Sequence, residues 1–125
     1  MKVTSKVFVY GTLKRTQVNH QLLNSATYLG LFNTQPYYKM FHLGGYPGVV
    51  KGGSTSIQGE VYQVDVLSMN KLDRLEGYPH AYTRELIQTP WGNAWIYLYR
   101  GSIEGRTAIP TGVWHDNVYW RRWSR

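Results

Sequence analysis

Residues 7–15 constrain the fold more than any other stretch, because an apolar, β-branched run stops there at a Tyr-Gly-Thr turn. Val, Phe and Tyr side chains favour a buried strand. Gly11 permits a sharp turn that a side chain would block, and such a turn leaves backbone N–H groups free around it. The stretch therefore predicts a strand over residues 6–10. The turn after it is either a plain strand-to-loop turn or a place where a small anionic group binds.

A chain of 125 residues suits a single domain over residues 1–125 that buries one core. No run approaches the roughly 20 consecutive apolar residues that a membrane span needs, and the N-terminal stretch is too short and polar for a secretory signal. We therefore expect no membrane association. The absence of Cys excludes disulfides and thiol catalysis and favours a cytoplasmic location, although it is compatible with any compartment.

The chain is basic, with 14 Lys and Arg residues against 7 Asp and Glu residues and a formal net charge of +7. Such an excess suits an anionic small molecule or a nucleic acid. Much of it falls late in the sequence, where a solvated basic tail is the simpler interpretation, at Arg100, Arg106, Arg121, Arg122 and Arg125. A nucleic-acid partner is not expected, because the basic residues are few and no RNA-binding motif is present.

Short strand-like runs alternate with Gly-rich loops through most of the chain. The strand patterns cover residues 6–10, 27–33, 37–43, 57–64, 83–89 and 94–100. Loops are expected at residues 44–48 and 51–56, and a hairpin turn at residues 90–93. Gly30, inside the second run, predicts a bulge or a close backbone approach.

Two helices are predicted between these strands. Residues 19–24 fit a short helix with Asn19 as its N-cap. A second helix of about ten residues follows Asp65, with Gly77 as its left-handed C-cap. The apolar positions of this helix, which we expect to face the core, are Leu67, Met69, Leu72 and Leu75.

The small number of helices excludes a doubly wound sheet, because parallel strands need crossover helices between them. The fold class that fits best is α+β. We expect a mixed or antiparallel sheet that closes into a small β-barrel, with one or two short helices outside it. The region from Pro110 onward is irregular and aromatic and adds no predicted element.

The sequence argues against several common reactive sites. The four His residues lack metal-ligand spacing and no Cys could complete a zinc site, so no metal is expected. Neither a phosphate-binding P-loop nor a Gly-x-Ser-x-Gly elbow occurs. The serines have no evident His and Asp partners, so a nucleophilic triad is not expected.

Glu76 is the acidic residue with an unusual position, because it falls at the C-terminal end of the predicted helix. There the helix dipole opposes a negative charge by roughly 0.3–1 kcal/mol. A carboxyl group held against that field should have a raised pKa, as a general acid–base needs near neutral pH. The alternative is a surface glutamate paired with Arg74 or Arg84, and position alone does not decide between the two.

Two separated stretches resemble one family. The first is Val-Phe-Val-Tyr-Gly-Thr-Leu-Lys-Arg at residues 7–15. The second runs from Gly-Glu-Val-Tyr at residues 59–62 to Leu-Asp-Arg-Leu-Glu-Gly at residues 72–77. Together they are similar to the γ-glutamylcyclotransferase-like, or AIG2-like, family, and the opening stretch most resembles its γ-glutamylamine cyclotransferase branch. The resemblance extends at least over residues 6–99.

The resemblance implies a small β-barrel with flanking helices around a cavity that holds a γ-glutamyl head group. Glu76 matches the catalytic glutamate of the family. The residues implied to bind the substrate are Tyr10, Gly11, Thr12, Leu13, Tyr46, Tyr82 and Tyr99. The implied partner is a small-molecule γ-glutamyl substrate, and no metal or other cofactor is required.

The implied reaction is intramolecular. The α-amine of the substrate attacks its own γ-carbonyl group, which yields 5-oxoproline and a free amine or amino acid. Such a ring closure needs positioning more than a protein nucleophile. Because a shared fold does not guarantee turnover, the alternative is a catalytically idle protein that sequesters a small anionic or zwitterionic ligand in the same cavity. The sequence leaves open which amine departs and what the oligomeric state is.

Overall fold

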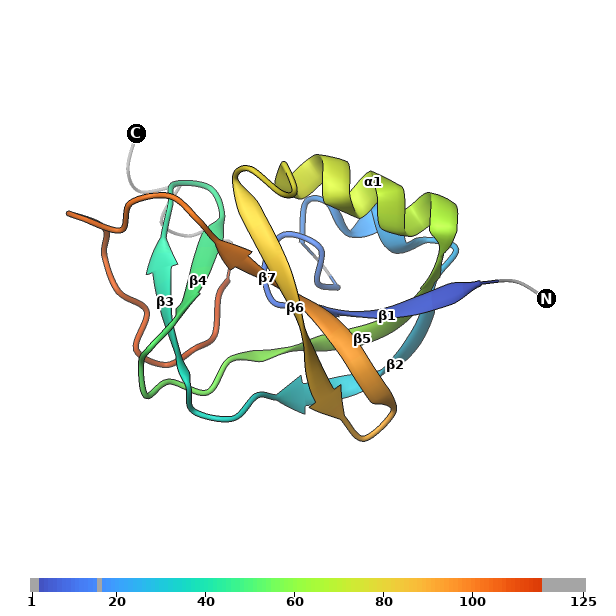
Figure 1. Ribbon diagram of the computed structural model, residues 1–125, viewed down its shortest axis with the longest axis horizontal. Helices are drawn as coiled ribbons and strands as arrows, with labels where there is room; N and C mark the ends of the chain where they lie inside the picture. The colour runs from blue at the N-terminus through green and yellow to red at the C-terminus, as the bar shows by residue number, and fades with distance from the viewer. Residues whose placement is uncertain (1–2, 16, 116–125) are drawn as a thin grey trace.

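The computed structural model describes residues 3–15 and 17–115 of the chain. In this part, five strands form one sheet in the order β2-β5-β1-β7-β6, and β3 pairs with β4 in a separate sheet. The strands are β1 (Thr4–Val9), β2 (Thr27–Asn33), β3 (Tyr38–His42), β4 (Pro47–Lys51), β5 (Gln58–Asp65), β6 (Tyr82–Thr89) and β7 (Gly92–Tyr99). The helices are the short 3-10 helix η1 (His20–Leu23) and α1 (Val66–Glu76), and Figure 1 shows α1 against one side of the large sheet.

β1 lies in the middle of the large sheet because its second half, residues 7–9, is apolar and buried on both faces. The strand pairs antiparallel with β5 and parallel with β7. Phe8 packs into a hydrophobic cluster with residues of the small sheet, whereas Val7 and Val9 pack into a second cluster beneath α1. The predicted first strand is confirmed, and Tyr10 follows directly after its end.

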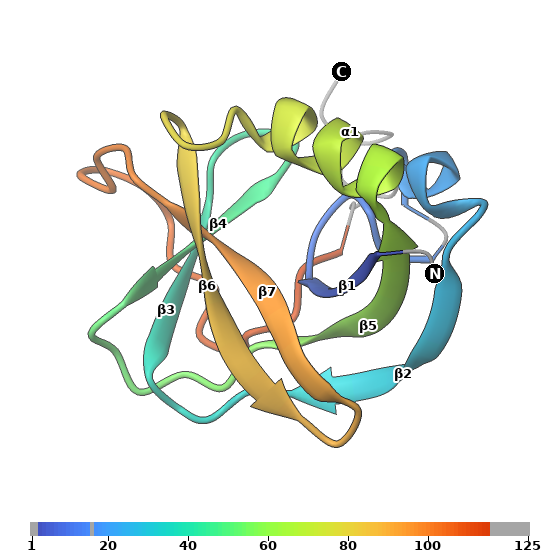
Figure 2. The same ribbon diagram turned by 45° about the vertical axis from the view of Figure 1, so that its right-hand side comes forward.

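The large sheet curls strongly but does not close into the predicted barrel, as Figure 2 shows. Its outer strands are β2 and β6, and no pairing joins them within the described residues. The register of β2 against β5 shifts between Tyr28 and Gly30, which marks a bulge. A Cβ atom on Gly30 would lie 2.5 Å from the Trp91 side chain, so this indole packs across the seam where a barrel would have hydrogen bonds. The fold class is therefore α+β with a curled, open sheet.

α1 begins and ends as the sequence predicted. Asp65 is its N-cap, and its Oδ1 accepts a hydrogen bond from the Ser68 N–H at 2.8 Å. Gly77 closes the helix in the left-handed region with φ of 64°, a conformation that glycine adopts without a steric penalty. These two caps fix the position at which Glu76 leaves the helix.

The buried face of α1 differs in part from the prediction. Met69 and Leu72 are buried, as expected. Leu67 and Leu75 were expected in the core as well, but they are 72% and 42% exposed. The prediction was wrong for these two residues because the helix contacts the sheet through a narrow stripe that also includes the small Ser68.

One further local prediction was wrong, and another was correct only in position. β4 occupies a segment that the sequence assigned mainly to Gly-rich loops, and its pairing with β3 places Val49 opposite Met40. That long-range pairing stabilises a strand whose own apolar run is too short to indicate one. Asn19 occupies the N-cap position of η1, as predicted, but its side chain makes no cap hydrogen bond and donates from Nδ2 to Thr12.

The C-terminal region is described as far as His115. Trp114 is buried in the same cluster as Phe8. The predicted basic tail with Arg121, Arg122 and Arg125 lies outside the described residues. In the described part of the chain, neither helix has the length and apolar character that a membrane crossing requires.

Candidate active site

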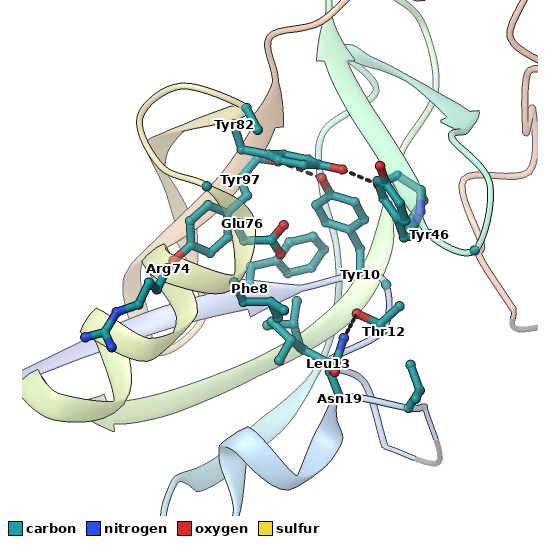
Figure 3. A pocket seen from close by; sticks show the side chains of 18 residues that line it. Phe8, Tyr10, Thr12, Leu13, Asn19, Tyr46, Arg74, Glu76, Tyr82 and Tyr97 are labelled. Carbon is teal, nitrogen blue, oxygen red and sulfur yellow. Dashed lines mark hydrogen bonds between the residues drawn. The ribbon is translucent and has the colours of Figure 1, made fainter.

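A pocket of about 460 Å³ opens where β1 ends, between the loop of residues 11–15 and the C-terminal end of α1. Figure 3 shows it from close by. The lining includes Tyr10 at the end of β1, Tyr46 from the β3–β4 turn and Glu76 from the end of α1. Segments that are far apart in the sequence therefore meet at one cavity.

Glu76 is the last residue of α1, and the chain turns away directly after it at Gly77. In Figure 3 its carboxyl group points into the pocket, toward Tyr10 and Phe8. Burial raises the pKa of this carboxyl group to about 7. The side chain can therefore both accept and donate a proton near neutral pH.

The alternative of a surface glutamate paired with an arginine does not describe Glu76. Arg84 pairs with Asp73 instead, with its Nε 3.4 Å from Oδ1. Arg74 also lines the pocket, but Figure 3 shows its guanidinium group extending away from Glu76. Within the described residues Glu76 forms no ion pair, so nothing offsets the effect of burial on its charge.

Three tyrosines of the inner wall already donate their hydroxyl hydrogens to protein acceptors. Tyr10 Oη donates to the carbonyl oxygen of Tyr97 at 2.7 Å. Tyr82 Oη donates to the carbonyl oxygen of Pro47 at 2.7 Å, and Tyr97 Oη donates to Oδ1 of Asp73 at 2.7 Å. Burial is the main cause that raises the pKa of all three above the usual value for tyrosine. They stay neutral near pH 7, so none of them can be the general base there.

The loop of residues 11–15 begins with a glycine because it passes close to Pro47. A Cβ atom on Gly11 would lie 2.8 Å from Pro47 Cδ. Asn19 holds the loop through two bonds to Thr12, from its Nδ2 to Oγ1 at 2.9 Å and from its N–H to the carbonyl oxygen at 2.8 Å. The N–H groups of residues 11–13 donate no hydrogen bond to another described residue. All three residues line the pocket, so its wall includes three residues whose backbone donors have no acceptor among the described residues.

The pocket brings together most of the residues that the sequence predicted. Its lining includes Tyr10, Gly11, Thr12, Leu13, Tyr46, Glu76 and Tyr82. Tyr99 lies outside the lining, and its ring packs against Tyr82 with the ring centroids 5.3 Å apart. Tyr97 lines the pocket and was not predicted. The signal was present, because alternation along β7 places Tyr97 and Tyr99 on one face.

The chemistry that this arrangement permits follows from the loop of residues 11–15 on one side of the pocket and Glu76 on the other. Three backbone donors suit a carboxylate or another small anion. A carboxyl group with a pKa of about 7 suits a proton transfer. Across residues 3–15 and 17–115, no cluster of three or more His, Asp or Glu side chains is arranged to hold a metal ion.

Known proteins are similar to this chain in sequence. A model of the family described as gamma-glutamyl cyclotransferase, AIG2-like, matches residues 7–116. A protein of Vibrio cholerae is 45% identical over 112 residues, which cover 90% of this chain and 96% of its own. The gamma-glutamylcyclotransferase family protein YtfP of Escherichia coli is 40% identical over 111 residues, which cover 89% of this chain and 96% of its own.

Solved structures share the fold. The solution structure of the Escherichia coli protein ytfP matches with a TM-score of 0.73 over 89% of this chain and 96% of its own. The crystal structure of an AIG2-like protein from Mus musculus is 28% identical and matches with a TM-score of 0.64, over 79% of this chain and 78% of its own. The resemblance first carried by two short stretches thus extends over most of the chain.

Proposed function

Because the chain belongs to the gamma-glutamyl cyclotransferase, AIG2-like family, we propose that it cyclises the γ-glutamyl group of a γ-glutamyl amine or amide. The products are 5-oxoproline and a free amine. The observation that carries this proposal is that Glu76 lines the same pocket as residues 11–13, whose N–H groups donate to no other described residue.

The loop of residues 11–15 binds the substrate. The α-carboxylate of the γ-glutamyl group accepts hydrogen bonds from the N–H groups of Gly11, Thr12 and Leu13. These donors have no acceptor in the described chain, so a bound carboxylate replaces water and disrupts no existing bond. Neighbouring Tyr10 and Tyr82 give the pocket a rigid aromatic wall against which the carbon chain of the substrate packs.

Glu76 moves the protons. As a carboxylate it removes a proton from the α-ammonium group, and the freed nitrogen attacks the γ-carbonyl carbon to close a five-membered ring. The bond to the leaving nitrogen then breaks as Glu76 returns its proton to that nitrogen. The ring nitrogen keeps one of its three hydrogens, and the other two depart with the amine as an ammonium ion. Glu76 therefore ends ionised, as it began.

The pKa of Glu76 fits both halves of this cycle. A carboxyl group with an ordinary pKa is a weak base toward an ammonium group and gives up its proton too early to assist the leaving nitrogen. A value of about 7 leaves both forms populated at neutral pH. The remaining acceleration comes from holding the amine against the carbonyl carbon of the same molecule, which needs no protein nucleophile.

The test is release of 5-oxoproline from γ-glutamyl-lysine and related γ-glutamyl amides, measured by mass spectrometry. Glu76→Gln should reduce kcat by about 10²–10⁴-fold, as expected for loss of a general acid–base. Glu85→Gln is the matched control, because Glu85 is an exposed carboxylate on β6 that pairs with Lys51 at 3.1 Å.

Normal turnover by a folded Glu76→Gln protein would refute the assignment of Glu76. Binding of the γ-glutamyl compound by the parent protein without release of 5-oxoproline would instead indicate a protein that sequesters its ligand. Calorimetric titration with the same compounds, run beside the turnover assay, separates these outcomes.

A further inference from the structure

Glu60 carries a buried carboxyl group, and the proposed reaction gives it no chemical step. It lies on β5 with 8% of its surface exposed, and it does not line the pocket. Burial of a carboxylate is unfavourable unless hydrogen bonds replace those it made with water. Its position is therefore explained only by the groups that it binds.

Those groups connect the sheet to the loop of residues 11–15. Oε1 of Glu60 accepts one hydrogen bond from the backbone N–H of Arg15 at 2.9 Å and another from Tyr62 Oη at 2.9 Å. Tyr62 is buried, and its ring packs against Tyr28 of β2 and His20 of η1. Glu60 thus fastens the C-terminal end of the loop to a rigid part of the molecule.

Other contacts hold the remainder of the loop. Asn19 bonds to Thr12 as described above, and His20 Nδ1 lies 3.0 Å from the carbonyl oxygen of Leu13. Lys14 Nζ donates to the carbonyl oxygen of Trp114 at 2.6 Å. The loop is held by side chains, carbonyl groups and the N–H groups of Lys14 and Arg15, while the N–H groups of residues 11–13 donate to no other described residue. A segment with unpaired donors relaxes toward other acceptors when such contacts are lost.

We propose that Glu60 is a positioning residue that holds the loop of residues 11–15 in the shape that binds the carboxylate of the substrate. The proposal rests on the proposed function. Glu60 acts through the Arg15 backbone and touches no substrate. Loss of its hydrogen bond should weaken substrate binding more than proton transfer, because Glu76 is held by a different element, α1.

Glu60 also contributes a negative charge, and the two contributions can be separated. Burial lowers the pKa of Lys14, and the charge of Glu60 acts in the opposite direction. Glu60→Gln removes the charge but keeps an oxygen that can accept from the Arg15 N–H. Glu60→Asp keeps the charge but shortens the side chain, which withdraws the oxygen from Arg15.

The experiment measures kcat and KM for 5-oxoproline release from γ-glutamyl-lysine. Glu60→Ala and Glu60→Asp should raise KM about tenfold, as expected for loss of one charge-assisted hydrogen bond. Their kcat and the pH midpoint of kcat should stay near those of the parent protein. Glu60→Gln should have a KM within about threefold of that of the parent protein. Glu85→Ala is the control for removal of an exposed carboxylate. Where Glu60→Ala does not fold, Glu60→Asp decides.

Amide hydrogen exchange of residues 11–15 tests the same role without turnover. In the absence of substrate, Glu60→Asp should speed this exchange about tenfold, whereas Glu60→Gln should not. An unchanged KM in Glu60→Asp, or a Glu60→Gln variant as impaired as Glu60→Asp, would overturn the proposal. Lack of turnover in the parent protein would count against the proposed function instead, and the exchange rates would still decide the role of Glu60.

Discussion

The hydroxyl group of Tyr97 donates a hydrogen bond to Oδ1 of Asp73 across 2.7 Å, and this bond joins β7 to the helix that carries Glu76. Asp73 lies on the last turn of α1. The same oxygen is 3.4 Å from Nε of Arg84 on β6. Two strands therefore hold the end of the helix, which keeps Glu76 directed into the pocket although helix ends commonly fray.

Replacement of Asp73 by Ala should lower the free energy of unfolding by about 1–3 kcal/mol, because the buried hydroxyl of Tyr97 loses its acceptor. Asp73→Asn keeps an oxygen that can accept from Tyr97, so its free energy of unfolding should fall by less. Urea denaturation of both variants at one pH measures the difference. Equal losses would show that the charge facing Arg84 matters more than the hydrogen bond.

The pH dependence of turnover should report the ionisation of Glu76. Because the proposed reaction uses ionised Glu76 as a base and burial raises its pKa to about 7, kcat should rise with pH and level off above this value. The measurement is the rate of 5-oxoproline release at saturating substrate across the neutral range. A midpoint at the ordinary value of 4.5 would show that the carboxyl group is hydrated in the working enzyme.

Glu76 should also make the protein less stable as the pH rises. Its pKa is about 7 when folded against 4.5 ordinarily, so the folded form binds the proton more tightly. The resulting stabilisation is complete below pH 4.5 and is lost as the pH rises through 7. Glu76→Gln should therefore be more stable than the parent protein in mildly alkaline buffer, by about 1–3 kcal/mol, and nearly equal to it in acid. Denaturation at both pH values tests this, and a difference that does not vary with pH would exclude ionisation as its cause.

Gly11→Ala should impair binding, because the new Cβ atom would lie 2.8 Å from Pro47 Cδ and the loop of residues 11–15 would have to move. We expect KM to rise about tenfold and the free energy of unfolding to fall by about 1–3 kcal/mol. Gly45→Ala is the matched control, since Gly45 also lines the pocket but has open space around its Cβ position. Steady-state kinetics of the pair should show the defect only in Gly11→Ala.

The features that the sequence predicted correctly depend on local rules. The apolar run of β1 and the two caps of α1 involve residues near one another in the chain, and those caps place Glu76. Propensity and capping act over a few residues, so a single sequence contains them. The position of Glu76 at a helix end was therefore predictable. The sequence also predicted a raised pKa, but it did so from the helix dipole, whereas the cause is burial in a pocket that distant segments build.

The features that were missed depend on pairing between distant segments. Tyr97 and Tyr99 share a face of β7, and the parallel register that sets Val7 opposite Trp95 decides how far along β7 the pocket lies. The open seam beside Gly30 likewise depends on where the Trp91 indole comes to rest. The strand register and the packing of Trp91 have no local signal, whereas the alternation along β7 that puts Tyr97 on the same face as Tyr99 does. The family resemblance identified the loop after β1 and Glu76 as site residues, but it did not predict the strand register.

The hydrogen bonds of the wall tyrosines leave the pocket with acceptors on one side and donors on the other. Since Tyr10 and Tyr82 have donated their hydrogens to backbone carbonyl groups, their oxygens can only accept from a guest, as can an ionised Glu76. The N–H groups of residues 11–13 can only donate. An α-amino acid head group carries an acceptor, its carboxylate, and a donor, its ammonium group, on one carbon atom. It therefore matches this pocket in one orientation, because the reversed orientation would place donors against donors and acceptors against acceptors. For a head group bound as proposed, the cavity would therefore distinguish the carboxylate end from the ammonium end without any contact to the leaving amine.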